Sequence, residues 1–82
     1  MVRIFVYDAD FEDAPYPSEI IEVPVLTGKL FHTYTRAYYA LYDGMNVRLE
    51  FCHEDNTPFL SCTLCCDGQS DFSRTIVDER RV

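Results

Sequence analysis

The segment LFHTYTRAYYALY, residues 30–42, decides the fold expected for this chain because it carries the clearest periodicity in the sequence. It holds five of the chain's twelve aromatic residues. Wound as an α-helix, the segment places apolar side chains on one face at i, i+3, i+4 and i+7 spacings. That face consists of Leu30, Phe31, Tyr34, Ala37, Tyr38 and Leu41. The pattern predicts an amphipathic helix at about residues 28–43 whose aromatic face packs on a core.

Signals at both ends support this helix. Thr27 is a suitable N-cap, and Leu26 and Phe31 flank it as the apolar pair of a hydrophobic staple. Gly44 can adopt the positive φ that ends a helix. Lys29 in the first turn has the wrong sign for the helix dipole, and the Tyr and Thr content is typical of a strand. A strand therefore stays open as an alternative for this segment.

The polar face of the helix is expected to direct its side chains away from the core. Its members are Lys29, His32, Thr33, Arg36, Tyr39 and Asp43. Tyrosine combines an apolar ring with a polar hydroxyl, which suits it to interfaces. Tyr39 is therefore the candidate on this helix for contact with a partner.

Two β-branched segments precede the helix. VRIFVY, residues 2–7, predicts a strand inside the sheet because both of its faces are largely apolar. EIIEVPVL, residues 19–26, predicts a second strand, at an edge or with a bulge, because Pro24 cannot donate to a ladder. These strands can pair antiparallel across an acidic loop at residues 8–18. The loop partly matches calcium-ligand spacing, but Asp13 stands where glycine is needed, which favours a solvated loop over a calcium site.

A hairpin is predicted at residues 45–66, where two alternating segments flank the turn-forming sequence HEDNTP. Loops of two or four residues centred on Asp55 and Asn56 give the same register. That register pairs Phe51 with Leu60, Leu49 with Cys62, Val47 with Leu64 and Met45 with Cys66. Every apolar pair then lies on one face, and a slip by one residue would destroy this arrangement.

The cysteines raise the question of zinc. The candidate ligands are Cys52, His53, Cys62, Cys65 and Cys66. Four ligands must converge within about 2.3 Å of the ion, whereas the register separates Cys52 from Cys65 by roughly 20 Å of strand. The register also directs Cys62 and Cys66 into the core. We therefore expect buried or free thiols and no cofactor, and a small zinc-stabilised module remains an alternative.

The C-terminal part predicts a turn at residues 67–71 and a last strand, FSRTIV, at residues 72–77. The charged tail DERRV, residues 78–82, is expected to fray. The whole chain, residues 1–82, is expected to be a single α+β domain in the order ββαββ(β). About four to five mostly antiparallel strands would carry the helix on one face.

Charge is the strongest global signal of function. The chain has 14 acidic and 7 basic residues, a net charge of −7. Residues 1–22 and 43–71 each carry six acids and one base. Because nucleic-acid binding requires Lys and Arg to neutralise phosphates, this balance argues against nucleic acid as a direct partner. It favours a basic protein partner, although negative charge that merely keeps the chain soluble is the simpler alternative.

The sequence contains no glycine-rich phosphate loop, nucleophile elbow or zinc-protease helix. Cys52 and His53 are adjacent, and neighbouring residues of a strand point to opposite faces, so they would not act together. We therefore expect a protein that is not an enzyme. No apolar run reaches the roughly 18 residues of a membrane span, which together with the absence of a signal pattern predicts the cytoplasm, including that of a host cell.

The leading expectation is an inhibitor or modulator that occupies a basic, nucleic-acid-binding site on a partner protein. In size and charge alone, the chain resembles small acidic viral and phage inhibitors that mimic nucleic acid, such as anti-defence proteins. The candidate binding residues are Asp8, Asp10, Glu12, Asp13, Glu54, Asp55 and Tyr39. A further alternative is an accessory subunit that docks through its apolar tyrosine face. The sequence does not predict an oligomeric state.

Overall fold

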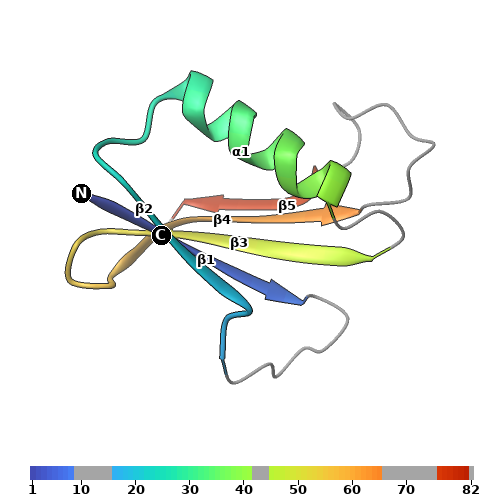
Figure 1. Cartoon of the computed structure of the whole chain (residues 1–82), viewed down its shortest axis with the longest axis horizontal. Helices are drawn as coiled ribbons and strands as arrows, with labels where there is room; N and C mark the ends of the chain where they lie inside the picture. Colours follow the sequence, from blue (N-terminus) through green and yellow to red (C-terminus); the bar gives the residue numbers. More distant parts are fainter. Residues whose placement is uncertain (9–15, 42–44, 66–75, 82) are drawn as a thin grey trace.

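The computed structural model describes residues 1–8, 16–41, 45–65 and 76–81, in which one helix packs on one face of an antiparallel sheet (Figure 1). In chain order the elements are β1 (Val2–Asp8), β2 (Glu19–Val23), α1 (Gly28–Leu41), β3 (Asn46–Cys52), β4 (Pro58–Cys65) and β5 (Ile76–Arg81). The predicted α+β class is confirmed. The segment for which helix and strand were both open forms a helix.

The described strands lie in the order β2-β1-β3-β4-β5, and every neighbouring pair is antiparallel. β1 therefore lies inside the sheet, as predicted, and β2 forms an edge that ends just before Pro24. Because β2 and β3 both run antiparallel to β1, they are parallel to each other, and α1 connects them across β1. This crossover brings the start of α1 to the same end of the sheet as the β3–β4 loop (Figure 1).

The predicted register of the β3–β4 hairpin is confirmed. Phe51 opposes Leu60, Leu49 opposes Cys62, and Val47 opposes Leu64. The predicted pair of Met45 with Cys66 includes a residue outside the described ranges. The loop itself differs from the prediction, because the His53 N–H donates to the Thr57 carbonyl at 2.9 Å and leaves three residues, 54–56, in the loop. Asn56 there has φ of 69°, in the left-handed region that asparagine tolerates better than most residues.

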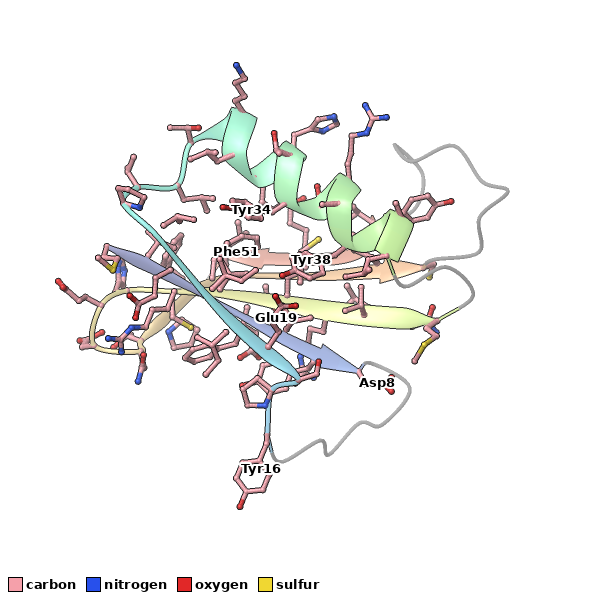
Figure 2. All side chains as sticks on the ribbon, viewed as in Figure 1. Asp8, Tyr16, Glu19, Tyr34, Tyr38 and Phe51 are labelled. Atoms are coloured by element: carbon pink, nitrogen blue, oxygen red, sulfur yellow. The ribbon has the colours of Figure 1, made fainter. Side chains whose placement is uncertain are left out.

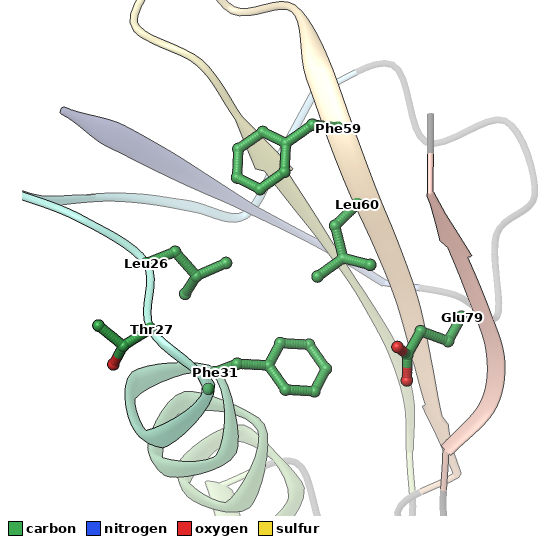
Figure 3. A pocket seen from close by; sticks show the side chains of 7 residues that line it. Leu26, Thr27, Phe31, Phe59, Leu60 and Glu79 are labelled. Atoms are coloured by element: carbon green, nitrogen blue, oxygen red, sulfur yellow. The ribbon is translucent and has the colours of Figure 1, made fainter.

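A loop with an odd number of residues would shift the register by one, and a β-bulge in β4 restores it. Cys52 opposes Pro58 while Phe51 opposes Leu60, so Phe59 is the extra residue. The bulge brings Phe59 to the same side of β4 as Leu60 (Figure 3). In a regular strand these two neighbours would point to opposite faces of the sheet.

The capping of α1 follows the prediction. The Thr27 hydroxyl accepts a hydrogen bond from the Leu30 N–H at 3.1 Å, and the Thr27 carbonyl accepts one from the Phe31 N–H at 2.9 Å. The helix ends at Leu41 in the described chain, and Gly44 lies outside the described residues. The first turn is therefore fixed by its cap, despite the unfavourable charge of Lys29.

The face that α1 buries is rotated from the predicted one. Thr35 and Tyr38 are the buried residues of the helix, whereas Ala37 and Leu41 are exposed. The Thr35 hydroxyl donates to the carbonyls of Phe31 and His32, each at 3.0 Å, so its polar group is satisfied inside the helix. A threonine can therefore occupy a core position that the sequence pattern gave to alanine and leucine.

The core lies between α1 and the sheet. Its buried apolar side chains are Ile4, Val6, Val23, Tyr38, Val47, Leu49, Phe51, Leu60, Cys62 and Leu64. Figure 2 shows Tyr34 and Tyr38 extending from the helix towards the sheet near Phe51. The rings of Phe31 and Phe51 lie 5.4 Å apart at a tilt of 49°, an arrangement that adds to the stabilisation from burial.

β5 extends further towards the C-terminus than the predicted last strand. The predicted strand at residues 72–77 overlaps β5 only at Ile76 and Val77, and residues 72–75 lie outside the described ranges. Asp78 to Arg81, expected to fray, pair instead with β4. The edge of β4 offers unpaired N–H and C=O groups to any neighbouring backbone, so pairing there does not require apolar side chains.

The face of the sheet opposite α1 is open among the described elements and carries polar and aromatic side chains. Its partly exposed residues in β1, β3 and β4 are Arg3, Phe5, Tyr7, Arg48, Glu50, Ser61, Thr63 and Cys65. Arg48 lies over the Tyr7 ring at 4.7 Å and places its Nε 3.6 Å from Glu50 Oε1. Arg3 Nε donates to Glu22 Oε1 at 3.1 Å, and its Nη1 donates to Asn56 Oδ1 at 2.9 Å.

Candidate functional site

A pocket of about 250 Å³ opens between the start of α1 and the strands β4 and β5 (Figure 3). Leu26, Phe31, Phe59 and Leu60 supply its apolar walls. Thr27 and Gly28 line it at the start of the helix, and Glu79 of β5 contributes a carboxylate. Glu79 opposes Cys62 in the ladder, on the same face of the sheet as α1, which explains its place in the pocket wall.

The β3–β4 loop connects to this pocket through two rings that lie against each other at a tilt of 32°. His53, the residue before the loop, lies 4.7 Å from the Phe59 ring, centroid to centroid. The loop then carries the exposed acids Glu54 and Asp55. We call the pocket and these two acids the hairpin end of the sheet. Apolar walls and negative charge therefore come together at this end.

The geometry of the loop fixes the charge of Asp55. Its carboxylate accepts the Thr57 N–H at 3.0 Å, and the Asn56 N–H donates to the His53 carbonyl at 2.9 Å. The hydrogen bonds from Thr57, with a smaller effect from His53, hold the pKa of Asp55 below its ordinary value. Asp55 therefore stays ionised well below neutral pH.

Asp8, the other acidic candidate within the described residues, lies at the opposite end of the sheet, which we call the β1–β2 end. Asp8 opposes Val47 at the start of β3, whereas the hairpin end begins after Cys52. Those positions are about 17 Å apart along the strand at ~3.4 Å per residue, and Figure 2 shows Asp8 at the opposite end of the sheet from the β3–β4 loop. Asp10, Glu12 and Asp13 lie outside the described residues. The structure therefore does not bring Asp8 together with Glu54 and Asp55.

The connection at the β1–β2 end is closed by Ser18. Its N–H donates to the Val6 carbonyl at 2.7 Å, and its hydroxyl donates to the same oxygen at 3.1 Å. Tyr16, two residues earlier, is 81% exposed and points away from the sheet (Figure 2).

Tyr39 is placed differently from the prediction. It is partly buried and packs against the core, as do Phe31 and Tyr34. The expectation that it faces away from the core is therefore wrong, because the buried face of α1 is rotated towards it. The tyrosine face proposed as a docking surface for an accessory subunit packs on the chain's own sheet.

The candidate zinc ligands within the described residues are spread along the hairpin. Cys52 opposes Pro58 beside the loop, and Cys65 opposes Asn46 at the far end of the ladder. Cys62 is buried in the core, as predicted, whereas Cys66 lies outside the described ranges. No three His, Cys, Asp or Glu side chains of the described residues gather as ligands for a metal ion.

Cys52 is more buried than its outward position in the register implied. It opposes Arg3 of β1 on the open face, yet only 1% of it is exposed. Burial raises the pKa of the Cys52 thiol, and the carboxylates of Glu50 and Asp55 raise it further. The thiol is therefore held in its neutral form, in which it is a poor nucleophile.

Sequence reasoning did not find the pocket. Phe59 joins Leu60 on one side only because of the bulge, and Glu79 was assigned to a tail expected to fray. The bulge follows from a loop whose length the turn-forming sequence left undetermined. A three-residue loop with Asn56 in the left-handed region is the sequence signal from which the bulge could have been predicted.

Comparison with known proteins gives no further guidance: no family model matches the chain, and neither the curated proteins nor the solved structures searched show a match. Within the described ranges, the single helix, at 14 residues, is too short to cross a bilayer.

Proposed function

We propose that this chain is a non-enzymatic, acidic protein-binding module. It occupies a basic, nucleic-acid-binding surface of a partner protein, and so acts as an inhibitor or modulator of that partner. Binding takes place through the hairpin end, where Glu54 and Asp55 adjoin an apolar pocket. The acids of the β1–β2 end, including Asp8, add to the long-range attraction of a basic partner.

The observation that carries this proposal is how the charges of the sheet are distributed. Arg3 and Arg48, the cations of β1 and β3, already face acids of their own chain, Glu22 and Glu50. Glu54 and Asp55, by contrast, are exposed at the tip of the hairpin. The negative charge is therefore presented outwards while two of the seven basic residues are engaged within the fold. A basic surface is the complementary partner.

The combination of negative charge and apolar walls at one end of the sheet also favours a protein partner over a small ion. Interfaces commonly surround an apolar centre with a polar rim. At the hairpin end, the pocket supplies the centre, and Glu54 and Asp55 supply part of the rim. Electrostatic attraction then accelerates the encounter, and apolar contact holds the complex.

The test begins with affinity capture from cell extract, followed by reconstitution with the purified partner. We expect calorimetric affinity to fall at least tenfold between about 50 and 300 mM salt, because salt screens surface charge. A DNA or RNA duplex that binds the partner should compete with this chain for the same surface. Affinity that is indifferent to salt, or a ternary complex with the duplex, would contradict the proposal.

Charge-neutralising variants locate the surface. Glu54→Gln with Asp55→Asn removes two charges and keeps an oxygen that can accept the Thr57 N–H. The comparison variant changes Asp8→Asn with Glu19→Gln, the same charge at the β1–β2 end. We expect the first pair to weaken binding about tenfold or more and the second only a few-fold. The reverse order would assign the surface to the β1–β2 end.

A further inference from the structure

We propose that the pocket at the start of α1 receives a lysine or arginine side chain of the partner. The apolar stem lies between Leu26, Phe31 and Phe59, and the cationic head reaches the carboxylate of Glu79. This inference rests on the proposed function and identifies the contact by which the hairpin end recognises a basic partner.

The lining of the pocket matches a side chain that is apolar along its length and charged at its tip. Leu26, Phe31, Phe59 and Leu60 are apolar, and Glu79 is the charged residue among the described lining (Figure 3). Lysine and arginine bury their methylene stems along apolar surface and keep the charged head at a polar rim. Two phenyl rings in the walls also favour a cation over a neutral head group.

Size points to one side chain as the occupant. The volume of about 250 Å³ is below the ~300–1,000 Å³ of pockets that enclose drug-sized ligands. A cofactor or a folded segment would not fit, whereas a single long side chain would. The pocket is therefore the size of an anchor site for one residue of a protein partner.

An anionic occupant is disfavoured although the pocket adjoins a helix N-terminus. Thr27 already satisfies the N–H groups of Leu30 and Phe31, which reduces the donors available to an anion. Glu79 would repel an anion in the same space. Lys29 follows Gly28 and is exposed, but it does not line the pocket.

The surroundings of the pocket add to its preference for cations. The His53 ring lies against that of Phe59, and His53 leads directly into Glu54 and Asp55, so two further exposed acids belong to the loop at this end of the sheet. A partner with several basic residues could place one in the pocket and its neighbours against these acids. Each head group then meets opposite charge at the rim, where desolvation costs little.

The experiment uses the full chain, labelled with ¹⁵N, and two peptides at pH 6.5 and low salt. One is acetyl-pentalysine amide, and the other replaces each lysine with diaminobutyric acid, which has the same charge and two fewer methylenes per side chain. If stems are buried in the pocket, the lysine peptide should bind about tenfold more tightly. Its largest amide shifts should fall at Leu26, Phe31, Phe59 and Leu60.

A matched pair of variants separates the pocket from general charge. Glu79→Gln keeps the shape of the side chain and removes its charge, and we expect it to weaken pentalysine binding about fivefold. Glu19→Gln removes the same charge at the start of the edge strand β2 and should change binding less than twofold. Both residues are exposed, so both variants should keep the thermal stability of the parent chain.

The outcomes distinguish this inference from the proposed function. Equal affinity for the two peptides, or equal weakening by the two variants, overturns the pocket contact, and salt-sensitive binding of the basic partner would still support the proposed function. If the lysine peptide binds with the expected stem and Glu79 dependence but no basic partner competes with it, the pocket stands and the proposed function fails.

Discussion

The two faces of the sheet are built from the same strands, yet they contribute to the molecule in different ways. On the face under α1, Ile4, Leu49 and Phe51 are fully shielded from water. On the open face, Tyr7 and Arg48 belong to the same strands and stay partly exposed. Burial stabilises by roughly 25 cal/mol per Å² of apolar surface, whereas an exposed ion pair contributes about 0–1 kcal/mol. The packing of α1 on one face therefore stabilises the fold, which leaves the open face and the ends of the sheet free for recognition.

The largest expected effect tests this division with one substitution on each face. Phe51→Ala removes a fully buried ring that packs on Phe31, and it should lower the free energy of unfolding by about 3–5 kcal/mol. Phe5→Ala makes the same chemical change on the open face and should cost about 1 kcal/mol. Chemical denaturation followed by circular dichroism measures both. Equal losses would show that the open face is covered as tightly as the other.

Much of this division could be predicted from the sequence. The period of two in residues 47–51 and 60–64 correctly predicted the register and the buried face of the hairpin, because a slip would expose every apolar side chain at once. The interior position of β1 followed from its two apolar faces. The cap of α1 followed from Thr27, whose hydroxyl can satisfy a backbone N–H in the first turn.

The candidate site could not be predicted in the same way. Phe59 reaches the pocket because of a bulge. A bulge changes the face to which a residue points, and the amino-acid composition of the strand does not reveal it. Glu79 reaches it through backbone pairing of β5, which no apolar pattern signals. The rotation of α1 was not predicted because Thr35 is a polar residue. Its hydroxyl donates to the Phe31 carbonyl within the helix, which allows the side chain to be buried. The expectation that Asp8 and the hairpin acids belong to one surface was wrong, because the sequence does not reveal that they lie at opposite ends of the sheet.

A smaller effect is expected from the polar contacts of the open face. Arg48→Met removes the cation over Tyr7 and the charge facing Glu50, but it keeps an apolar stem of similar length. Arg48 Nε is buried and has no hydrogen-bond partner within the described residues. Removing this unsatisfied N–H is favourable, and it offsets part of the stability lost with the cation–π contact and the ion pair. We expect the free energy of unfolding to change by no more than about 1 kcal/mol.

Urea denaturation of Arg48→Met beside the parent chain measures this change, and Glu50→Gln provides the matched control. A loss as large as that from Phe51→Ala would mean that the open face carries a buried ionic network. The division between the two faces would then be wrong. A small loss of stability in both variants would support the division between a stabilising face and an open face.

The smallest expected effect is a pH dependence confined to the open face. Burial raises the pKa of Tyr7, Glu50 raises it further, and Arg48 lowers it in part. Because the folded protein holds the phenol proton more tightly than the unfolded chain, the stabilisation is complete below the ordinary value of about 10. It is lost as pH rises through the raised pKa of Tyr7. The pKa of Cys52 is raised mainly by burial, so this thiol acts in the same direction from about pH 8.5 upwards.

The measurement follows the free energy of unfolding between about pH 8 and 11 for the parent chain and Tyr7→Phe. The phenylalanine variant keeps the ring under Arg48 but has no proton to lose, so its stability should fall less steeply above pH ~10. Parallel curves would show that the Tyr7 hydroxyl is as well solvated in the folded state as in the unfolded chain. The open face would then contribute no burial at this position.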